Sequence, residues 1–180
     1  FLYAGALDGG EITPNQLIKD VPTIISGYAP KNYNEKYDGA VPASRALSRS
    51  LNVPIVKLLQ KFGVQKFHNQ LNRMGMTTID RPSTDYGLSL VLGGAEASLI
   101  ELTSIYANMA KTLNDFSIGR KSKFIQPTYV KSFINEREND NLLLSPGATW
   151  VTFEAMLAVS RPDAEANWQQ FSSSQKIAWK

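Results

Sequence analysis

The sequence predicts a mostly α-helical domain with a few short strands. Its 180 residues are 43% hydrophobic and 19% charged, which is typical of one folded core and disfavours a disordered or fibrous chain. Apolar residues recur at helical spacing in several segments, and capping residues and glycines stand at the segment ends. Strand-like alternation is confined to short stretches. We therefore expect helices packed on a common core.

Local signals divide the first forty residues into three parts. Residues 1–7 are apolar and read as the tail of a helix that Gly9-Gly10 stops, and we expect its beginning to lie outside the chain. Next, Thr13-Pro14-Asn15-Gln16 has a cap hydroxyl, a proline at the first helical position and a glutamine three residues after the cap. This pattern predicts a short helix to about Ile18. Residues 23–41 are rich in Tyr, Asn, Pro and Gly and predict a wrapping loop, with at most a short strand at 23–25.

Three consecutive helices are predicted to follow this loop. The first spans about 42–51, the second spans 53–62 with Asn52 as its cap and Gly63 as its terminator, and the third spans 64–74. Their apolar residues have helical spacing, as faces packed on one core would: Ile55, Leu58, Leu59, Phe62, Phe67, Leu71 and Met74. These helices are expected to form a compact subdomain.

The second half of the chain predicts two further helices. Ser98 and Glu101 form a capping-box pattern at the start of an amphipathic helix that continues through Met109. Another helix is predicted from Ser145-Pro146-Gly147 to about Val159, with Arg161-Pro162 as its stop.

Further strands are predicted in the last third of the chain. Residues 125–134 alternate in the manner of a strand, and the charged residues 135–141 would turn the chain into a small hairpin. Residues 176–179 read as a final strand, so we expect the chain to end within secondary structure.

Composition excludes several kinds of site. The chain has no cysteine, which excludes a disulfide, a thiolate nucleophile and a cysteine-ligated metal. The single histidine, His68, excludes a histidine cluster, and its place in a helical pattern predicts a surface or half-buried residue. The net charge of +3 comes from scattered basic residues and gives no support to nucleic-acid binding. No apolar run is long enough to span a membrane, so an anchor is expected outside the chain.

The candidate site is Ser50-Leu51-Asn52, between two predicted helices. A junction of this kind can present a hydroxyl and an amide toward a cleft, because neither side chain is committed to packing within a helix. By itself the pattern is weak, since Asn52 could simply cap the next helix and Ser50 could be incidental.

Two longer runs make the pattern specific. Residues 39–56 read GAVPASRALSRSLNVPIV and residues 92–107 read LGGAEASLIELTSIYA. The first resembles the second-motif region of penicillin-binding transpeptidases, in which ALxxSxNxPxV surrounds the Ser-x-Asn. The second resembles the LGGxExSxxELxxAYA segment of the same family. The resemblance covers nearly the whole chain.

The two ends fit the same family. Residues 1–8 resemble the segment that directly follows the nucleophile motif Ser-x-x-Lys, and residues 176–180 resemble the approach to the third motif, Lys-Thr-Gly. Residues 1–180 are thus expected to be an incomplete transpeptidase domain, with Lys180 as the lysine of the third motif. Without this match Lys180 would be read as a solvated terminal residue. Residues 145–150, 160–162 and 177–180 are most similar to the penicillin-binding protein 1C subgroup.

The resemblance implies an α/β-type serine transpeptidase fold of the β-lactamase kind, with a five-stranded sheet and a helical subdomain in the complete domain. It implies peptidoglycan stem peptides ending in D-Ala-D-Ala as substrates, β-lactams as ligands, no cofactor, and a place on the extracytoplasmic face of the bacterial inner membrane. Ser50 would relay a proton, Asn52 would orient the substrate, and Lys180 would supply positive charge. The chain most resembles the class A penicillin-binding proteins, and class A membership implies a glycosyltransferase domain elsewhere in the protein. Without the nucleophile, these residues alone are expected not to acylate.

Three alternatives remain at this point. A helical nucleic-acid-binding module would bind DNA in a salt-dependent manner, although Lys57, Lys61 and Lys66 are interspersed with core positions. A non-catalytic scaffold would lack the serine or the lysine of the upstream motif. A serine β-lactamase would have the same kinds of catalytic motif. However, the loop at 23–41 and the segment at 101–107 resemble the peptidoglycan synthases of this superfamily more closely than the β-lactamases.

Overall fold

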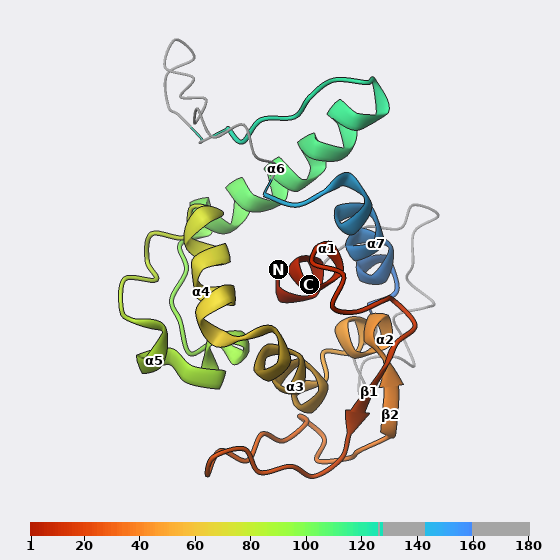
Figure 1. Cartoon of the computed structure of the whole chain (residues 1–180), viewed down its shortest axis with the longest axis vertical. Helices are drawn as coiled ribbons and strands as arrows, with labels where there is room; N and C mark the ends of the chain where they lie inside the picture. The colour runs from red at the N-terminus through yellow and green to blue at the C-terminus, as the bar shows by residue number, and fades with distance from the viewer. Residues whose placement is uncertain (126, 128–142, 160–180) are drawn as a thin grey trace.

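Helices surround a central short helix in the computed structural model, which describes residues 1–125, 127 and 143–159. In Figure 1, α1 lies in the middle, with α2, α3, α4 and α7 around it. The prediction of a mostly helical chain is confirmed. The described elements are α1 (Leu2–Asp8), β1 (Leu17–Asp20), β2 (Gly39–Pro42), α2 (Ala43–Ser48), α3 (Asn52–Phe62), α4 (Val64–Arg73), α5 (Ser83–Tyr86), the 3₁₀ helix η1 (Gly87–Leu92), α6 (Leu99–Ser117) and α7 (Pro146–Leu157).

The core is built around α1. Leu2, Tyr3, Ala4 and Ala6 are all at most 2% exposed, so this helix is buried on nearly every side. Gly5 allows α4 to come close, because a Cβ atom there would collide with the side-chain amide of Gln70. The predicted helix at the start of the chain is confirmed, and α3, α4 and α7 pack against it.

A two-stranded antiparallel sheet replaces the short helix expected at 13–18. Gln16 N–H donates to the Thr13 carbonyl at 3.1 Å, which closes only one turn, and the chain then enters β1. β1 pairs with β2 in a register that places Leu17 opposite Pro42 and Asp20 opposite Gly39. The helix prediction is wrong because pairing with a strand some twenty residues later outweighs the local capping pattern.

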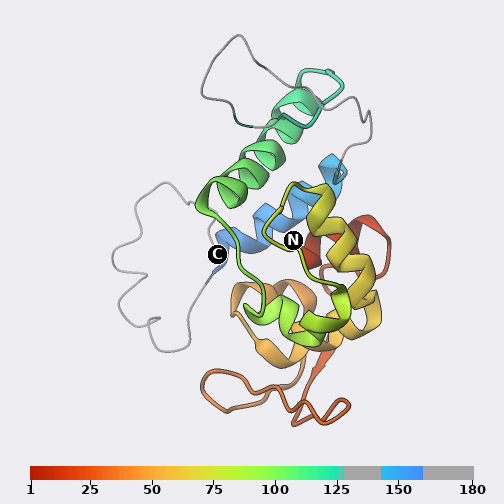
Figure 2. The same cartoon turned by 90° about the vertical axis from the view of Figure 1, so that its left-hand side faces the viewer.

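The segment between the strands forms the wrapping loop that the sequence predicts. Its only strand-like feature within the described residues is an isolated bridge between Ile25 and Tyr28, so the short strand allowed at 23–25 does not form. In both Figure 1 and Figure 2 the loop lies at one end of the molecule and α6 at the other.

The helices predicted at 42–51, 53–62, 64–74 and from Ser98 are present, whereas no helix was predicted where α5 and η1 form. α3 ends at Gly63, whose φ of 95° suits glycine. The predicted capping box of α6 is present, since Ser98 Oγ accepts from Glu101 N–H at 3.3 Å and Glu101 Oε2 accepts from Ser98 N–H at 3.0 Å. α6 continues well past Met109 to Ser117.

α7 begins as the sequence predicts, with Ser145 Oγ accepting from Ala148 N–H at 3.2 Å. Most of the predicted hairpin at 125–141, the stop at Arg161-Pro162 and the final strand at 176–179 lie outside the described residues. Among the helices that the structure describes, none has the length and apolar character needed to cross a membrane.

Candidate active site

The Ser50-Leu51-Asn52 motif forms a tight turn between α2 and α3. Ser50 N–H donates to the Leu47 carbonyl and Leu51 N–H donates to the Ala46 carbonyl, each at 3.0 Å. This nested pair is the Schellman arrangement, which requires a left-handed residue just after the helix, and Ser50 fills that position with a φ of 56°. Leu51 then turns inward and packs with Val41 and Ala46.

The turn presents the Ser50 side chain to solvent. Glycine is the usual residue at this position, because any Cβ atom makes the left-handed conformation costly. Ser50 is exposed, and within the described part of the chain its hydroxyl makes no hydrogen bond. The strained backbone therefore holds a free hydroxyl at the surface, a combination that is concentrated at functional sites.

Asn52 does not cap α3, which corrects the simpler interpretation of this residue. It is the first residue of α3, and its side-chain Nδ2 donates to the Lys31 carbonyl in the wrapping loop at 2.8 Å. The N–H of Val53 instead donates to Asn32 Oδ1 at 3.1 Å. A loop residue thus satisfies an amide at the start of the helix, where the chain has no partner of its own.

The structure brings together two of the three predicted site residues. Ser50 and Asn52 flank one turn, next to the loop that contains Lys31 and Asn32. Lys180 lies outside the described residues. Sequence analysis did not identify Asn32 as part of the site, because its partner Val53 lies 21 residues further along the chain.

Ion pairs surround the turn. Arg49, the residue before Ser50, pairs with Asp38 near the end of the loop. Lys31 pairs with Glu35 at 3.0 Å, and this hydrogen bond and charge raise the pKa of Lys31 above its ordinary value. Lys31 and Glu35 are both exposed, so their pair contributes little to stability.

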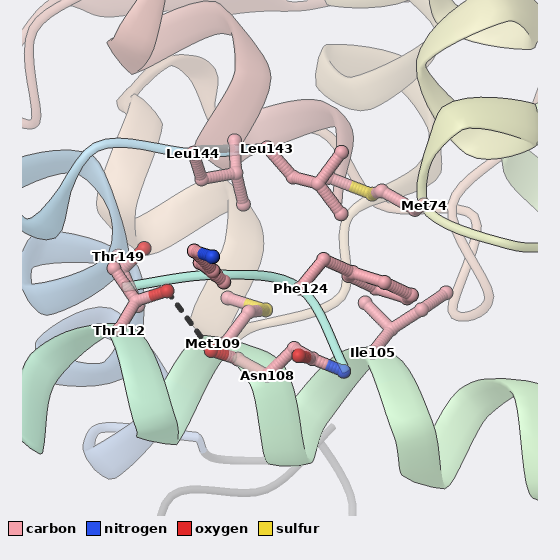
Figure 3. Close-up of a pocket in the computed structure, with 10 residues that line it drawn as sticks. Met74, Ile105, Asn108, Met109, Thr112, Phe124, Leu143, Leu144 and Thr149 are labelled. Carbon is pink, nitrogen blue, oxygen red and sulfur yellow. Dashed lines mark hydrogen bonds between the residues drawn. The ribbon is translucent and has the colours of Figure 1, made fainter. Parts of the chain in front are cut away.

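Two hollows elsewhere are separate from the motif. A cavity of about 20 Å³ lies between α6, α7 and Phe124, and apolar side chains such as Met74 and Ile105 line most of it (Figure 3). An open groove of about 390 Å³ lies over α6 and α7, with Trp150 58% exposed beside it. Neither hollow is lined by Ser50 or Asn52.

His68 is more buried than predicted. It lies on α4 with 8% of its surface exposed, and its Nε2 is 2.9 Å from the Arg81 carbonyl, so it ties the α4 helix to the segment before α5. Among the described residues, no group of histidines and carboxylates could hold a metal ion.

A family model described as the penicillin binding protein transpeptidase domain matches residues 1–176. The chain belongs to this transpeptidase family. Penicillin-binding protein 1C of Escherichia coli (strain K12) is 32% identical over 163 residues, which cover 90% of this chain and 20% of that protein. Penicillin-binding protein 1F of Bacillus subtilis (strain 168) is 32% identical over 75% of this chain and 17% of that protein. The predicted similarity to the 1C subgroup is confirmed.

Solved structures show the same fold. Penicillin-binding protein 1A from Haemophilus influenzae matches 97% of this transpeptidase chain and 30% of its own, with a TM-score of 0.65 and 19% identity. The penicillin-binding protein PonA1 from Mycobacterium tuberculosis matches 94% of this chain and 46% of its own, with a TM-score of 0.65 and 17% identity. The predicted fold class is therefore confirmed. The chain spans only about a fifth of the length of penicillin-binding proteins 1C and 1F, the two relatives named above.

Proposed function

We propose that this chain is part of a peptidoglycan D,D-transpeptidase that cross-links stem peptides through a serine acyl-enzyme and binds β-lactams. The main support for this proposal is the turn that exposes the Ser50 hydroxyl beside the Asn52 amide, which the wrapping loop fixes in place. This turn lies within a chain that matches the transpeptidase family over residues 1–176. The parent protein would be bifunctional, with a glycosyltransferase domain, and would act at the extracytoplasmic face of the bacterial inner membrane.

The reaction has two acyl-transfer steps. The serine of an upstream Ser-x-x-Lys motif would attack the carbonyl carbon of the D-Ala-D-Ala bond, the C–N bond would break, and D-Ala would leave as the amine after gaining a proton. An amine of a second stem peptide would then attack the ester, release the serine and complete the cross-link. A β-lactam would acylate the same serine and stop at the ester.

Ser50 is suited to proton transfer. Its hydroxyl can accept a proton and donate one at the same time, and no described residue occupies either capacity. It would connect the upstream lysine with the departing amine, and Lys180 would hold this relay and the substrate carboxylate by its charge. Positioned proton transfer of this kind typically contributes about 10²-fold to 10⁴-fold in rate.

Asn52 is suited to orienting the substrate. One of its two amide hydrogens is bonded to the Lys31 carbonyl, which fixes the orientation of the amide group. The second N–H and the carbonyl oxygen are left for a peptide of the substrate. A fixed amide of this kind binds with little further loss of side-chain entropy.

Covalent labelling of the full-length parent by a fluorescent penicillin tests the proposal. We expect Ser50→Ala and Asn52→Ala each to lower the acylation rate by about 10²-fold or more, and Lys180→Ala to lower it as well. Ser44→Ala, which removes a half-buried hydroxyl from α2 outside the turn, is the matched control and should label normally.

The same assay has a clear contrary outcome. A folded parent that never labels would overturn the transpeptidase activity and favour a non-catalytic scaffold. The isolated 180-residue chain should not label, because the proposed nucleophile precedes residue 1.

A further inference from the structure

A buried polar pair lies beneath the candidate turn. Asp20 is 0% exposed and Asn32 is 2% exposed, and Asn32 Nδ2 donates to Asp20 Oδ1 at 2.8 Å. The same nitrogen also donates to the Lys36 carbonyl at 2.8 Å, while Asn32 Oδ1 accepts from Val53 N–H at 3.1 Å. Every hydrogen-bonding atom of the Asn32 side chain is therefore used, and the orientation of its amide is determined by these partners.

Asp20, the last residue of β1, binds both the middle and the far end of the wrapping loop. One carboxylate oxygen holds Asn32, and the other accepts from Asp38 N–H at 3.0 Å. Burying a carboxylate costs folding free energy unless hydrogen bonds compensate for the lost water. The Asp20 carboxylate therefore needs both donors, and each donor is fixed in place by the carboxylate. The loop is thus held as one unit against the end of β1.

The loop contacts residues on both sides of Ser50 in the turn. Before the turn, Asp38 pairs with Arg49. After the turn, the Lys31 carbonyl holds the Asn52 amide, and Asn32 holds the N–H of Val53. Residues 49, 52 and 53 are therefore all tied to a loop that is itself tied to Asp20.

The sequence of the turn requires such external support. Leu51 occupies the position where a polar side chain would normally cap α3, but it is 4% exposed and belongs to the apolar cluster with Val41 and Ala46. Ser50 is also held in a left-handed conformation that it does not favour. Contacts from outside the turn must maintain both features.

We propose that Asn32, aligned by Asp20, is a positioning residue for the Ser-x-Asn motif. It acts through the turn and does not touch the reacting atoms. By capping α3 from the loop, it sets the direction of the Asn52 amide and keeps the Ser50 hydroxyl in place. This inference rests on the proposed function, because its consequence is measured as the rate of acylation.

The test uses four variants of the full-length parent: Asn32→Ala, Asn32→Asp, Asp20→Asn and the double variant D20N/N32D. The rate constant for acylation by penicillin is measured over a range of concentrations, so that the acylation step is separated from binding, and thermal unfolding is recorded in parallel. We expect Asn32→Ala to slow acylation at least tenfold. Asn32→Asp should be slower still, because two carboxylates then face each other in a buried site.

The double variant distinguishes positioning from a general loss of stability. The carboxylate introduced at position 32 can accept from Val53 N–H and from the amide introduced at position 20, so the link between loop and helix is restored. The bond to the Lys36 carbonyl is lost in both Asn32→Asp and the double variant, because a carboxylate cannot donate. We therefore expect the double variant to recover part of the acylation rate that Asn32→Asp loses. A double variant no faster than Asn32→Asp, although folded, would overturn the proposed link.

Two control variants set the baseline. Ser98→Ala removes the cap of α6, far from the turn, and Asn34→Ala removes a side chain that accepts from Lys36 N–H within the same loop. Both should keep the wild-type acylation rate. If Asn32→Ala slows acylation no more than Ser98→Ala does, Asn32 is not a positioning residue. If the wild-type parent itself never acylates, the proposed function fails, which is a different result.

Discussion

Leu51 N–H donates to the Ala46 carbonyl across a turn in which the intervening Ser50 has a φ of 56°. The bond, 3.0 Å long, places Leu51 in the core and leaves Ser50 outside in a conformation that favours glycine. The chain therefore accepts backbone strain to keep a side chain that glycine lacks. This pairing of strain and exposure is the expected mark of a functional residue.

We predict opposite effects of Ser50→Gly on stability and on acylation. Relative to Ser50→Ala, the glycine variant should gain roughly 1 kcal/mol in free energy of unfolding, because a Cβ atom at this φ is unfavourable. Both variants lack the hydroxyl, so both should lose acylation by penicillin. Denaturant unfolding and penicillin labelling of the parent protein measure the two effects.

Gly63→Ala is the control for this prediction. Gly63 has a φ of 95°, and among the described residues a Cβ atom there would meet only Lys66 Cβ within 4 Å, at 3.9 Å, so the cost of alanine comes from the backbone. It should lower stability, in contrast to Ser50→Gly. Equal stabilities of Ser50→Gly and Ser50→Ala would show that the turn is not strained.

Local interactions explain what the sequence predicts well. The capping box of Ser98 and Glu101 joins residues three apart, and the stop at Gly63 depends on the conformation of a single residue. Such features depend on the identities of a few neighbouring residues. The position of the Ser50 turn between two helices was predictable for the same reason.

Long-range contacts explain what the sequence does not predict. Asn52 looks like a helix cap, but its amide bonds to the Lys31 carbonyl, and the amide of Val53 bonds to Asn32. The short helix expected at Thr13–Ile18 yields to pairing between β1 and β2. In each case the deciding partner is more than ten residues away, and no local pattern identifies it.

We predict that Glu101 makes the domain sensitive to acid. Desolvation raises the pKa of Glu101, but hydrogen bonds from Ser98 and Thr77 outweigh it and lower the pKa to about 2. Because the folded-state pKa lies below the unfolded value, the carboxylate stabilises the fold above about pH 4.5, and this contribution is lost as the pH falls toward 2. After allowance for solvent screening, it should be about 1 to 2 kcal/mol.

Glu101→Gln measures this contribution. Its unfolding free energy should fall below that of the wild type at pH 7, and the difference should narrow between pH 5 and pH 2. Glu154→Gln, at an exposed position on α7, controls for the removal of a charge. A difference for Glu101→Gln that stays constant over this range would contradict the lowered pKa.

We predict that Gly94→Ala lowers the free energy of unfolding and that Gly147→Ala raises it. A Cβ atom at Gly94 would lie 2.8 Å from the Ser89 carbonyl oxygen, which also accepts from Gly94 N–H at 2.8 Å. Because a backbone atom must move, Gly94→Ala should cost about 1 to 3 kcal/mol. At Gly147, in the first turn of α7, a Cβ atom meets nothing within 4 Å among the described residues.

Gly147→Ala should therefore raise stability by about 0.5 to 1 kcal/mol, because alanine restricts the unfolded chain and favours the helix. Thermal unfolding of the two variants side by side is the measurement. A loss of stability at Gly147 would indicate that another part of the parent protein packs against this turn.

Thr149 and Thr152 of α7 should respond in opposite ways to valine. Both are buried, at 0% and 2% exposed, but Thr152 Oγ1 donates to the Ala148 carbonyl at 2.7 Å, whereas Thr149 Oγ1 has no partner among the described residues. Thr149→Val removes an unpaired polar atom beside the cavity of Figure 3, so it should be neutral or stabilising. Thr152→Val loses a hydrogen bond and should be about 1 kcal/mol less stable than Thr149→Val in denaturant unfolding. Comparable losses in both variants would instead mean that the Thr149 hydroxyl is satisfied in the parent, by a water molecule in that cavity or by another segment.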